Sequence, residues 1–188
     1  MTGRLKTGLR LPQTAQGKWI LFGVVATVVV IADQLSKLWI DSAFAVASVH
    51  PLPGQAEPTP VLGEFVRIAK NYNSGGIFGL FGNTAMVLAL TSTVVIGLIV
   101  VYQWREGTRS AWPLALALGL LFGGAIGNFI DRVRLGAVID FVDIGIGAWR
   151  FYTFNVADSA ISTALLLLIL MGLFGERIAA RLQHKPAG

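Results

Sequence analysis

Four long apolar stretches dominate the hydrophobic pattern of the chain. They cover residues 19–40, 84–104, 111–130 and 156–175. A helix that crosses the hydrocarbon core of a bilayer needs about 20 mostly apolar residues, and each stretch is close to that length. The second and third carry no charged residue, whereas the first and fourth each carry ionisable residues toward one end. The pattern predicts four transmembrane helices.

Basic residues are distributed unevenly over the segments that join and flank these stretches. Nine of the 15 lie on one predicted side of the membrane, namely Arg4, Lys6, Arg10, Lys18, Arg105, Arg109, Arg177, Arg181 and Lys185. Basic residues gather on the cytoplasmic side of membrane proteins, so both termini are predicted to be cytoplasmic. Residues 1–17 and 177–188 are then cytoplasmic tails, and residues 18–176 form one membrane domain.

The two segments on the opposite, extracytoplasmic side differ in pattern. Residues 51–60 are rich in Pro and Gly and predict a loop, and the alternation of apolar positions within residues 61–73 predicts one or two short strands. Residues 141–154 are apolar and aromatic, which suits the membrane–water interface. The predicted fold class is an all-α membrane protein with four transmembrane helices, a small extracytoplasmic β/loop element and an interfacial segment.

Composition agrees with a membrane protein. Charged residues make up 13% of the chain and hydrophobic residues 54%, whereas soluble domains carry about 25% charged residues. The chain has no cysteine, which excludes disulfides and thiolate chemistry. The net charge of +5 is explained by the cytoplasmic basic residues, and no nucleic-acid partner is predicted.

The basic start and the first apolar stretch also resemble a cleavable secretory leader that ends at Ala45, Val46 and Ala47. That triplet lies well beyond the apolar run, and Asp33 and Lys37 stand between them. We therefore expect the first stretch to be retained as a helix.

Ionisable and amide side chains converge on the extracytoplasmic ends of the predicted helices. Ionisable groups at membrane depth are costly, so each one is a hypothesis of function. Three different helices and the segment between the last two contribute to this group, which consists of Asp33, Lys37, Asn128, Asp131, Arg132, Asp140, Asn155 and Asp158.

The members of this group have different predicted roles. Asp33 and Lys37 are four residues apart on one helix face and predict a structural ion pair. Asp131 is interpreted as structural too. Asp140 and Asp158 have no cation near them in the sequence, and two neighbouring carboxylates that share one proton are the arrangement of aspartic proteases. A cation site or proton relay in a small transporter is the alternative.

Other chemistries fit the sequence poorly. His50 and His184 lie in aqueous segments on opposite sides of the membrane, so a zinc site of the HExxH kind is excluded and neither a metal nor a cofactor is predicted. Gly119, Gly123 and Gly127 are spaced four apart, which predicts close packing between helices.

Five motifs, in order, resemble the lipoprotein signal peptidases, also called signal peptidase II. They are DQLSK (33–37), NSGGIFG (73–79), GGAIGNFIDR (123–132), VIDF (138–141) and FNVADS (154–159), and the resemblance covers about residues 18–176. One departure is that Gly76 and Ile77 stand where the family usually has alanines.

The resemblance implies a reaction and a site. This family cleaves the signal peptide from bacterial prolipoproteins just before a cysteine that carries diacylglycerol, in the cytoplasmic membrane, and the peptide antibiotic globomycin blocks it. Its catalytic pair corresponds to Asp140 and Asp158. The resemblance further implies that substrate-lining or supporting roles belong to Asn73, Gly75, Asn128, Arg132 and Asn155, and structural roles to Asp33, Lys37 and Asp131. Asp131 is the second choice for a catalytic role.

Overall fold

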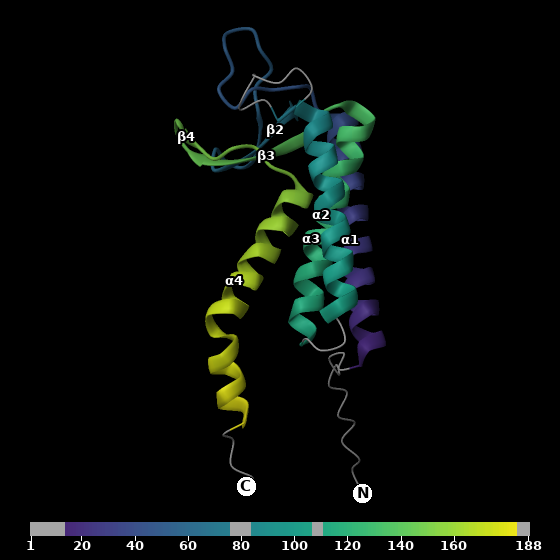
Figure 1. Cartoon of the computed structure of the whole chain (residues 1–188). Helices are drawn as coiled ribbons and strands as arrows, with labels where there is room; N and C mark the ends of the chain where they lie inside the picture. The colour runs from purple at the N-terminus through teal and green to yellow at the C-terminus, as the bar shows by residue number, and fades with distance from the viewer. Residues whose placement is uncertain (1–13, 76–83, 107–110, 184–188) are drawn as a thin grey trace, which may run out of the picture.

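The computed structural model has four long helices, with a small sheet at one end of them (Figure 1). It describes residues 14–75, 84–106 and 111–183, and the side chains of all of these except 84–85 and 175–183. The helices are α1 (Ala15–Ala43), α2 (Thr84–Glu106), α3 (Trp112–Leu135) and α4 (Val156–Gln183). Each contains a segment of 19 to 29 residues that is long and apolar enough to cross a membrane. The prediction of four spanning helices is therefore confirmed.

The helix ends have identifiable causes. Thr14 caps the start of α1, because its side chain accepts a hydrogen bond from the Gly17 N–H at 3.0 Å. The helix α3 starts with Pro in its first turn and ends at Gly136, whose φ of 68° is the left-handed conformation that glycine adopts freely. It extends to Leu135, about one turn beyond the predicted end of the third span.

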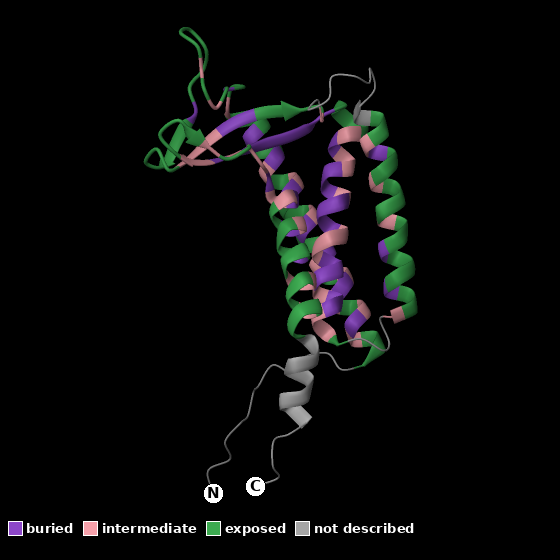
Figure 2. Ribbon diagram, turned by 60° about the vertical axis from the view of Figure 1, so that its left-hand side comes forward, coloured by how far each residue is buried: buried purple, intermediate pink, exposed green. Residues whose placement is uncertain are grey.

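The helix α3 is the centre of the membrane domain. In its most apolar part 56% of positions are buried, against 22% or less in the corresponding parts of the other three helices. Figure 2 shows the same contrast, with green exposed positions on the outer helices. The outer helices expose apolar side chains such as Val28, Leu98 and Leu166, which fits contact with lipid.

Glycines on α3 explain how three helices come so close together. A Cβ atom on Gly123 would lie 2.8 Å from the Ala26 carbonyl oxygen of α1, and one on Gly124 would lie 2.5 Å from the Ala157 carbonyl oxygen of α4. A Cβ on Gly119 would lie 2.9 Å from the Phe22 carbonyl oxygen. The predicted close packing by the glycine stripe is confirmed.

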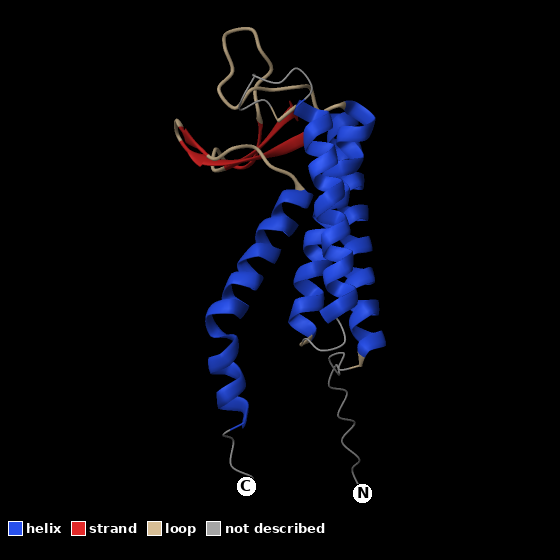
Figure 3. Cartoon of the chain, viewed as in Figure 1, coloured by secondary structure: helices blue, strands red, loops and turns tan. Residues whose placement is uncertain are grey.

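The sheet has four antiparallel strands in the order β1 (Thr59–Leu62), β2 (Val66–Asn73), β3 (Val138–Ile146) and β4 (Trp149–Arg150). All strands lie at one end of the helices (Figure 3), opposite the first described turn of α1 and the last described turn of α4. Strands within residues 61–73 were predicted, and the structure confirms them. The structure adds that residues 138–146, which include the motif VIDF, also form a strand.

Two buried basic clusters fasten the sheet. Lys70 of β2 donates to the Asp41 and Phe44 carbonyl oxygens at the end of α1, at 2.9 and 3.2 Å, and so binds the strand to the helix. Asp143 of β3 accepts hydrogen bonds from Arg67 Nε at 2.7 Å and Arg150 Nε at 3.0 Å. These contacts join side chains of β2, β3 and β4.

Candidate active site

Asp158 is held at the start of α4 by a reciprocal pair of hydrogen bonds. The side-chain oxygen of Asn155, just before the helix, accepts from the Asp158 N–H at 2.9 Å, and Asp158 Oδ2 accepts from the Asn155 N–H at 3.2 Å. This is the arrangement of a capping box, here made by Asn and Asp. It fixes the Asp158 carboxylate at the N-terminal end of the helix dipole, where negative charge is favoured.

Asp140 reaches the same place from the sheet. It lies on β3 opposite Asn71 of β2, and only 2% of its surface is exposed. Asn73 Nδ2 donates to Asp140 Oδ2 at 2.9 Å, and Asn155 Nδ2 donates to Asp140 Oδ1 at 2.8 Å. The side chain that caps α4 therefore also binds the second candidate carboxylate.

Asn128 of α3 completes the connection. Its Nδ2 donates to Asp158 Oδ1 at 2.7 Å, and its Oδ1 accepts from Asn155 Nδ2 at 3.1 Å. Asp140 and Asp158 thus share a network in which two amide side chains join them. The structure brings together the two carboxylates that the sequence paired, one from strand β3 and one from helix α4.

The buried ion cluster next to this network has a structural character. Lys37 Nζ lies 2.8 Å from Asp33 Oδ2 and 2.9 Å from Asp131 Oδ2, and it also donates to Asn128 Oδ1 at 3.0 Å. The predicted pair of Asp33 and Lys37 is confirmed. Because Lys37 spans from the two paired carboxylates to Asn128, it supports the candidate site without touching Asp140 or Asp158 directly.

Both acidic members of the cluster also bind backbone groups. Asp33 Oδ1 accepts from the Ala157 N–H at 2.9 Å, so a carboxylate of α1 caps a free donor in the first turn of α4. Asp131 Oδ2 accepts from the Ile139 N–H at 3.1 Å, which fixes the start of β3. These bonds position the backbone on either side of the candidate pair.

Gln34 is a member of the site that the sequence analysis did not identify. Its Nε2 lies 3.1 Å from Asp33 Oδ2, 3.1 Å from Asp131 Oδ1 and 3.2 Å from the Gly127 carbonyl oxygen. The signal available in the sequence was its position beside Asp33 in an otherwise apolar span. The hydrogen bonds to Gly127 and Asp131 join α1 to α3.

Arg132 and Gly75 border the site. Arg132 Nη1 donates to the Asn128 carbonyl oxygen at 3.3 Å. Gly75 has a φ of 78°, which favours glycine, and its N–H donates to Asn73 Oδ1 at 2.9 Å, so the turn orients the amide that binds Asp140. The departures at Gly76 and Ile77 lie outside the described residues.

The protonation of Asp140 is unusual. Burial raises the pKa of its carboxyl group from 3.8 to about 6, and the neighbouring charge of Asp158 acts in the same direction. The hydrogen bonds from Asn73 and Asn155 oppose this shift, and so does the charge of Lys37. A carboxyl group with this pKa can hold a proton close to neutral pH, which is required of a general acid.

A cavity of about 310 Å³ opens beside Asp158. It lies between α2, α3 and α4, and its walls are mostly apolar, with Asp158, Asn128 and Arg132 as the charged or amide residues. Thr91 and Ser92 of α2 also line it. The cavity therefore lies between the central helix α3 and the two outer helices α2 and α4, which expose apolar side chains such as Leu98 and Leu166.

The described acidic and histidine side chains near the candidate site are not arranged as a set of metal ligands. Across residues 14–75, 84–106 and 111–183, no group of three or more His, Cys, Asp or Glu side chains is placed to hold one. The polar contacts of Asp140 and Asp158 are made instead by amide and backbone N–H groups.

The fold belongs to a class of small bacterial membrane enzymes. Two solved structures, each titled a bacterial membrane enzyme structure by the in meso method, match it with TM-scores of 0.68 and 0.69 at 29% and 27% sequence identity. The match covers 80% and 88% of this chain and 90% and 93% of the solved chains.

Sequence comparison identifies the family within this class. Residues 25–174 match the family described as signal peptidase (SPase) II. Proteins named lipoprotein signal peptidase are similar over most of the chain: one from Methylorubrum extorquens is 40% identical over 79% of this chain and 83% of its own. One from Halalkalibacterium halodurans is 34% identical over 86% and 97%. The chain belongs to the signal peptidase II family and is a multi-pass membrane hydrolase. Nothing in these comparisons supports the transporter alternative.

Proposed function

We propose that the chain is an aspartic endopeptidase that uses Asp140 and Asp158 to remove the signal peptide from diacylglyceryl-modified prolipoproteins, cleaving before the lipidated cysteine. The observation that carries the proposal is the amide network, in which Asn155 binds Asp140 and caps the helix turn that holds Asp158. The relatives' name, lipoprotein signal peptidase, supports the substrate class.

The two carboxyl groups have different surroundings, which supports different roles. The raised pKa of Asp140 suits the member of the pair that holds the shared proton. Asp158 accepts hydrogen bonds from Asn128 Nδ2 and the Asn155 N–H at the start of α4, beside a cavity that a water molecule and substrate could enter. We therefore assign the role of general base to Asp158 and that of general acid to Asp140.

The proposed reaction has two steps, addition of water and release of the amine. Asp158 takes a proton from water while the resulting hydroxide attacks the scissile carbonyl carbon, and Asp140 gives its proton to the carbonyl oxygen. Asp158 next gives the proton it gained to the departing amide nitrogen, and Asp140 recovers its proton as the new carboxyl group forms. The pair ends in its starting state, so no cofactor is consumed.

The cavity beside Asp158 supports a route for the substrate. Its apolar walls on α2, α3 and α4 suit a signal-peptide helix and lipid that enter sideways from the bilayer. Arg132, at the edge of this cavity, suits a polar group of the substrate near the scissile bond. A peptide of the globomycin type, placing a hydroxyl group between Asp140 and Asp158, is the expected inhibitor.

Asp140→Asn and Asp158→Asn test the proposal. Each variant should lower cleavage of a diacylglyceryl-modified precursor by at least about a thousandfold, because general acid–base groups contribute up to about four orders of magnitude. The measurement is signal-peptide release by purified enzyme, normalised to the amount of folded protein.

Asp143→Asn is the matched control, because Asp143 lies on the same strand and is equally buried but binds Arg67 and Arg150. This variant should lose stability and keep its turnover per folded molecule. Strong turnover by either Asp140→Asn or Asp158→Asn would remove the assignment.

A further inference from the structure

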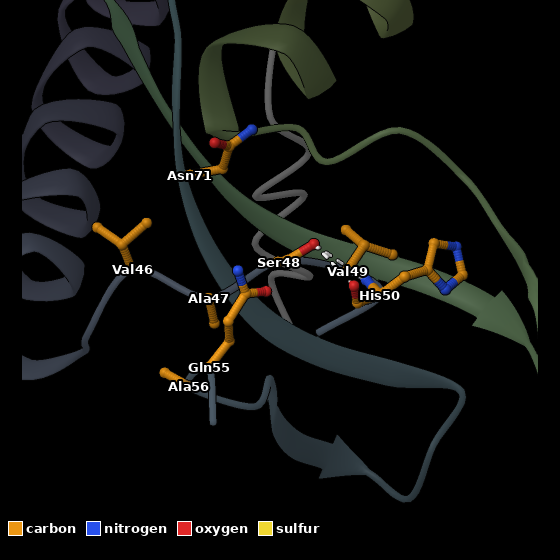
Figure 4. Close-up of a pocket in the computed structure, with 8 residues that line it drawn as sticks. All are labelled: Val46, Ala47, Ser48, Val49, His50, Gln55, Ala56 and Asn71. Carbon is orange, nitrogen blue, oxygen red and sulfur yellow. Dashed lines mark hydrogen bonds between the residues drawn. The ribbon is translucent and has the colours of Figure 1, made fainter. Parts of the chain in front are cut away.

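A second cavity, of about 520 Å³, lies outside all five sequence motifs (Figure 4). We call it the loop pocket. Its walls are the segment after α1, the Pro-rich loop and strand β2, and its eight lining residues are Val46, Ala47, Ser48, Val49, His50, Gln55, Ala56 and Asn71. Its volume is in the range of cavities that bind ligands.

The loop pocket exposes more polar wall than the cavity beside Asp158, and it is uncharged. Four of its eight lining residues carry hydrogen-bonding side chains (Ser48, His50, Gln55 and Asn71), and none is Asp, Glu, Lys or Arg, whereas Asp158 and Arg132 line the other cavity. The side-chain oxygen Oε1 of Gln55 accepts a hydrogen bond from the Leu52 N–H at 3.0 Å, which orients the side chain within the loop. The NH₂ groups of Gln55 and Asn71 bind no other described residue and can donate to a ligand.

Strand register places the loop pocket next to the candidate pair. Asn71, which lines the pocket, is the direct partner of Asp140 in the pairing of β2 with β3. The Cβ atoms of directly opposed residues lie about 4.5–5.5 Å apart. An extended peptide advances about 3.3 Å per residue, so a chain bound at Asp140 reaches the pocket within two or three residues.

The two cavities lie beside different members of the pair. The apolar one touches Asp158 between the helices, and the polar one is lined by Asn71, the strand partner of Asp140. A peptide bond held between the two carboxyl groups would have one part of its chain near each cavity. The apolar side fits the signal-peptide helix, which leaves the polar side for the segment after the scissile bond.

We propose that the loop pocket binds the residues that follow the lipidated cysteine, as an extended polypeptide with uncharged side chains. This inference rests on the proposed function, because it assumes that the scissile bond lies at Asp140 and Asp158. The uncharged, hydrogen-bonding lining favours small polar residues and peptide groups over acidic or basic side chains.

Two lipopeptides test it. Both carry the signal segment and the diacylglyceryl cysteine, but one continues for about eight residues, which reach about 27 Å when extended, and the other ends at the cysteine as an amide. The wild-type enzyme should cleave the longer peptide with a kcat/KM at least about fivefold higher, the effect of one or two hydrogen bonds. Gln55→Ala, and replacement of residues 51–57 by two glycines, should each bring this ratio close to one.

Glu57→Ala is the control, because Glu57 is exposed on the same loop and does not line the pocket. It should keep the wild-type ratio. A wild-type ratio of one, or a ratio that Gln55→Ala leaves unchanged, would overturn the assignment of the loop pocket while leaving the proposed function intact. Failure of the wild-type enzyme to cleave either peptide would instead contradict the proposed function itself.

Discussion

Asn155 shows how one side chain can bind two candidate carboxyl groups at once. Its oxygen caps the turn that carries Asp158, and its NH₂ group binds Asp140 at 2.8 Å. Because an amide has a donor end and an acceptor end, it can hold both acids without adding a charge. The positions of the two acids are therefore linked through neutral amide side chains, by Asn155 itself and by Asn128, which binds both Asn155 and Asp158.

The sequence predicted which residues meet at the site better than it predicted how they meet. The pairing of Asp140 with Asp158 followed from the absence of nearby cations and from the motif resemblance. The bridging geometry of Asn155 and Asn128 depends on the register of β3 and on the approach of α3 to α4, which no local pattern encodes. Gln34 was missed because a single amide in an apolar span has no periodic signal.

The ionisation of Asp140 makes stability depend on pH. Its pKa is raised from 3.8 to about 6 by burial, so the folded state holds the proton over a range where the unfolded state has lost it. The free energy of unfolding should fall as the pH rises from 3.8 to about 6, by about 3 kcal/mol in total, and stay lower above that range.

Asp140→Asn removes this dependence. The difference in melting temperature, variant minus wild type, should therefore increase between pH 4 and pH 8, and thermal unfolding of purified protein in detergent measures it. A difference that is constant or decreases over this range would contradict the raised pKa.

Asp131→Asn separates a structural acid from the candidate catalytic pair. Two donors, Lys37 Nζ and the Ile139 N–H, share one oxygen of Asp131, and Gln34 binds the other. An asparagine offers only one acceptor, so a buried donor would face its NH₂ group at a cost of about 2 kcal/mol. Melting temperature and the yield of folded protein should fall, while turnover per folded molecule changes less.

Asp41→Asn is the control for this substitution, because the Asp41 side chain is exposed and Lys70 keeps its hydrogen bonds to the Asp41 and Phe44 carbonyl oxygens, so the loss of stability should be smaller. A well-folded Asp131→Asn enzyme with no turnover would instead place Asp131 among the reactive groups.

At the scale of the elements, the helices were predictable and strand β3 was not. Each helix is an apolar run long enough to span lipid, which is a strong signal in a single sequence. In β3, the first four positions, Val138 to Phe141, are all buried, so the alternation that identifies a half-exposed strand is absent. The interfacial location of residues 141–154 stays a prediction, and the exposed Trp149 and Tyr152 near β4 are consistent with it.

Gly124→Ala tests the packing of α3 against α4. The new methyl group would lie 2.5 Å from the Ala157 carbonyl oxygen and 2.7 Å from an Ile161 side-chain carbon, so the start of α4 must move away. We expect a loss of about 1–3 kcal/mol, typical of overpacking, together with reduced cleavage because Asp158 moves with its helix.

Gly97→Ala provides the comparison, because nothing lies within 4 Å of the new atom on α2. This variant should be neutral or slightly more stable, since alanine favours a helix over glycine. Equal melting temperatures for the two variants would show that the close approach of α3 to α4 is not needed.

At the scale of the whole molecule, the sheet and both candidate carboxyl groups lie at one end of the helices, and the first described turn of α1 lies at the other (Figure 1). Lys18 and Arg105 lie toward that second end. The other seven basic residues of the predicted cytoplasmic side belong to the parts of the chain whose backbone or side chains the structure does not describe. The positive-inside rule then predicts that the site faces the extracytoplasmic side of the bacterial cytoplasmic membrane.

The orientation can be measured directly because the chain has no native cysteine. A cysteine introduced at Glu57, in the Pro-rich loop on the sheet side, should react with a membrane-impermeant maleimide in intact spheroplasts. One introduced at Glu106, at the opposite end of α2, should react only after the membrane is permeabilised. The two variants serve as controls for each other, since both replace a glutamate. Labelling of Glu106→Cys in intact spheroplasts, with Glu57→Cys protected, would reverse the orientation and place the carboxyl pair on the cytoplasmic side, where it could not meet an exported precursor.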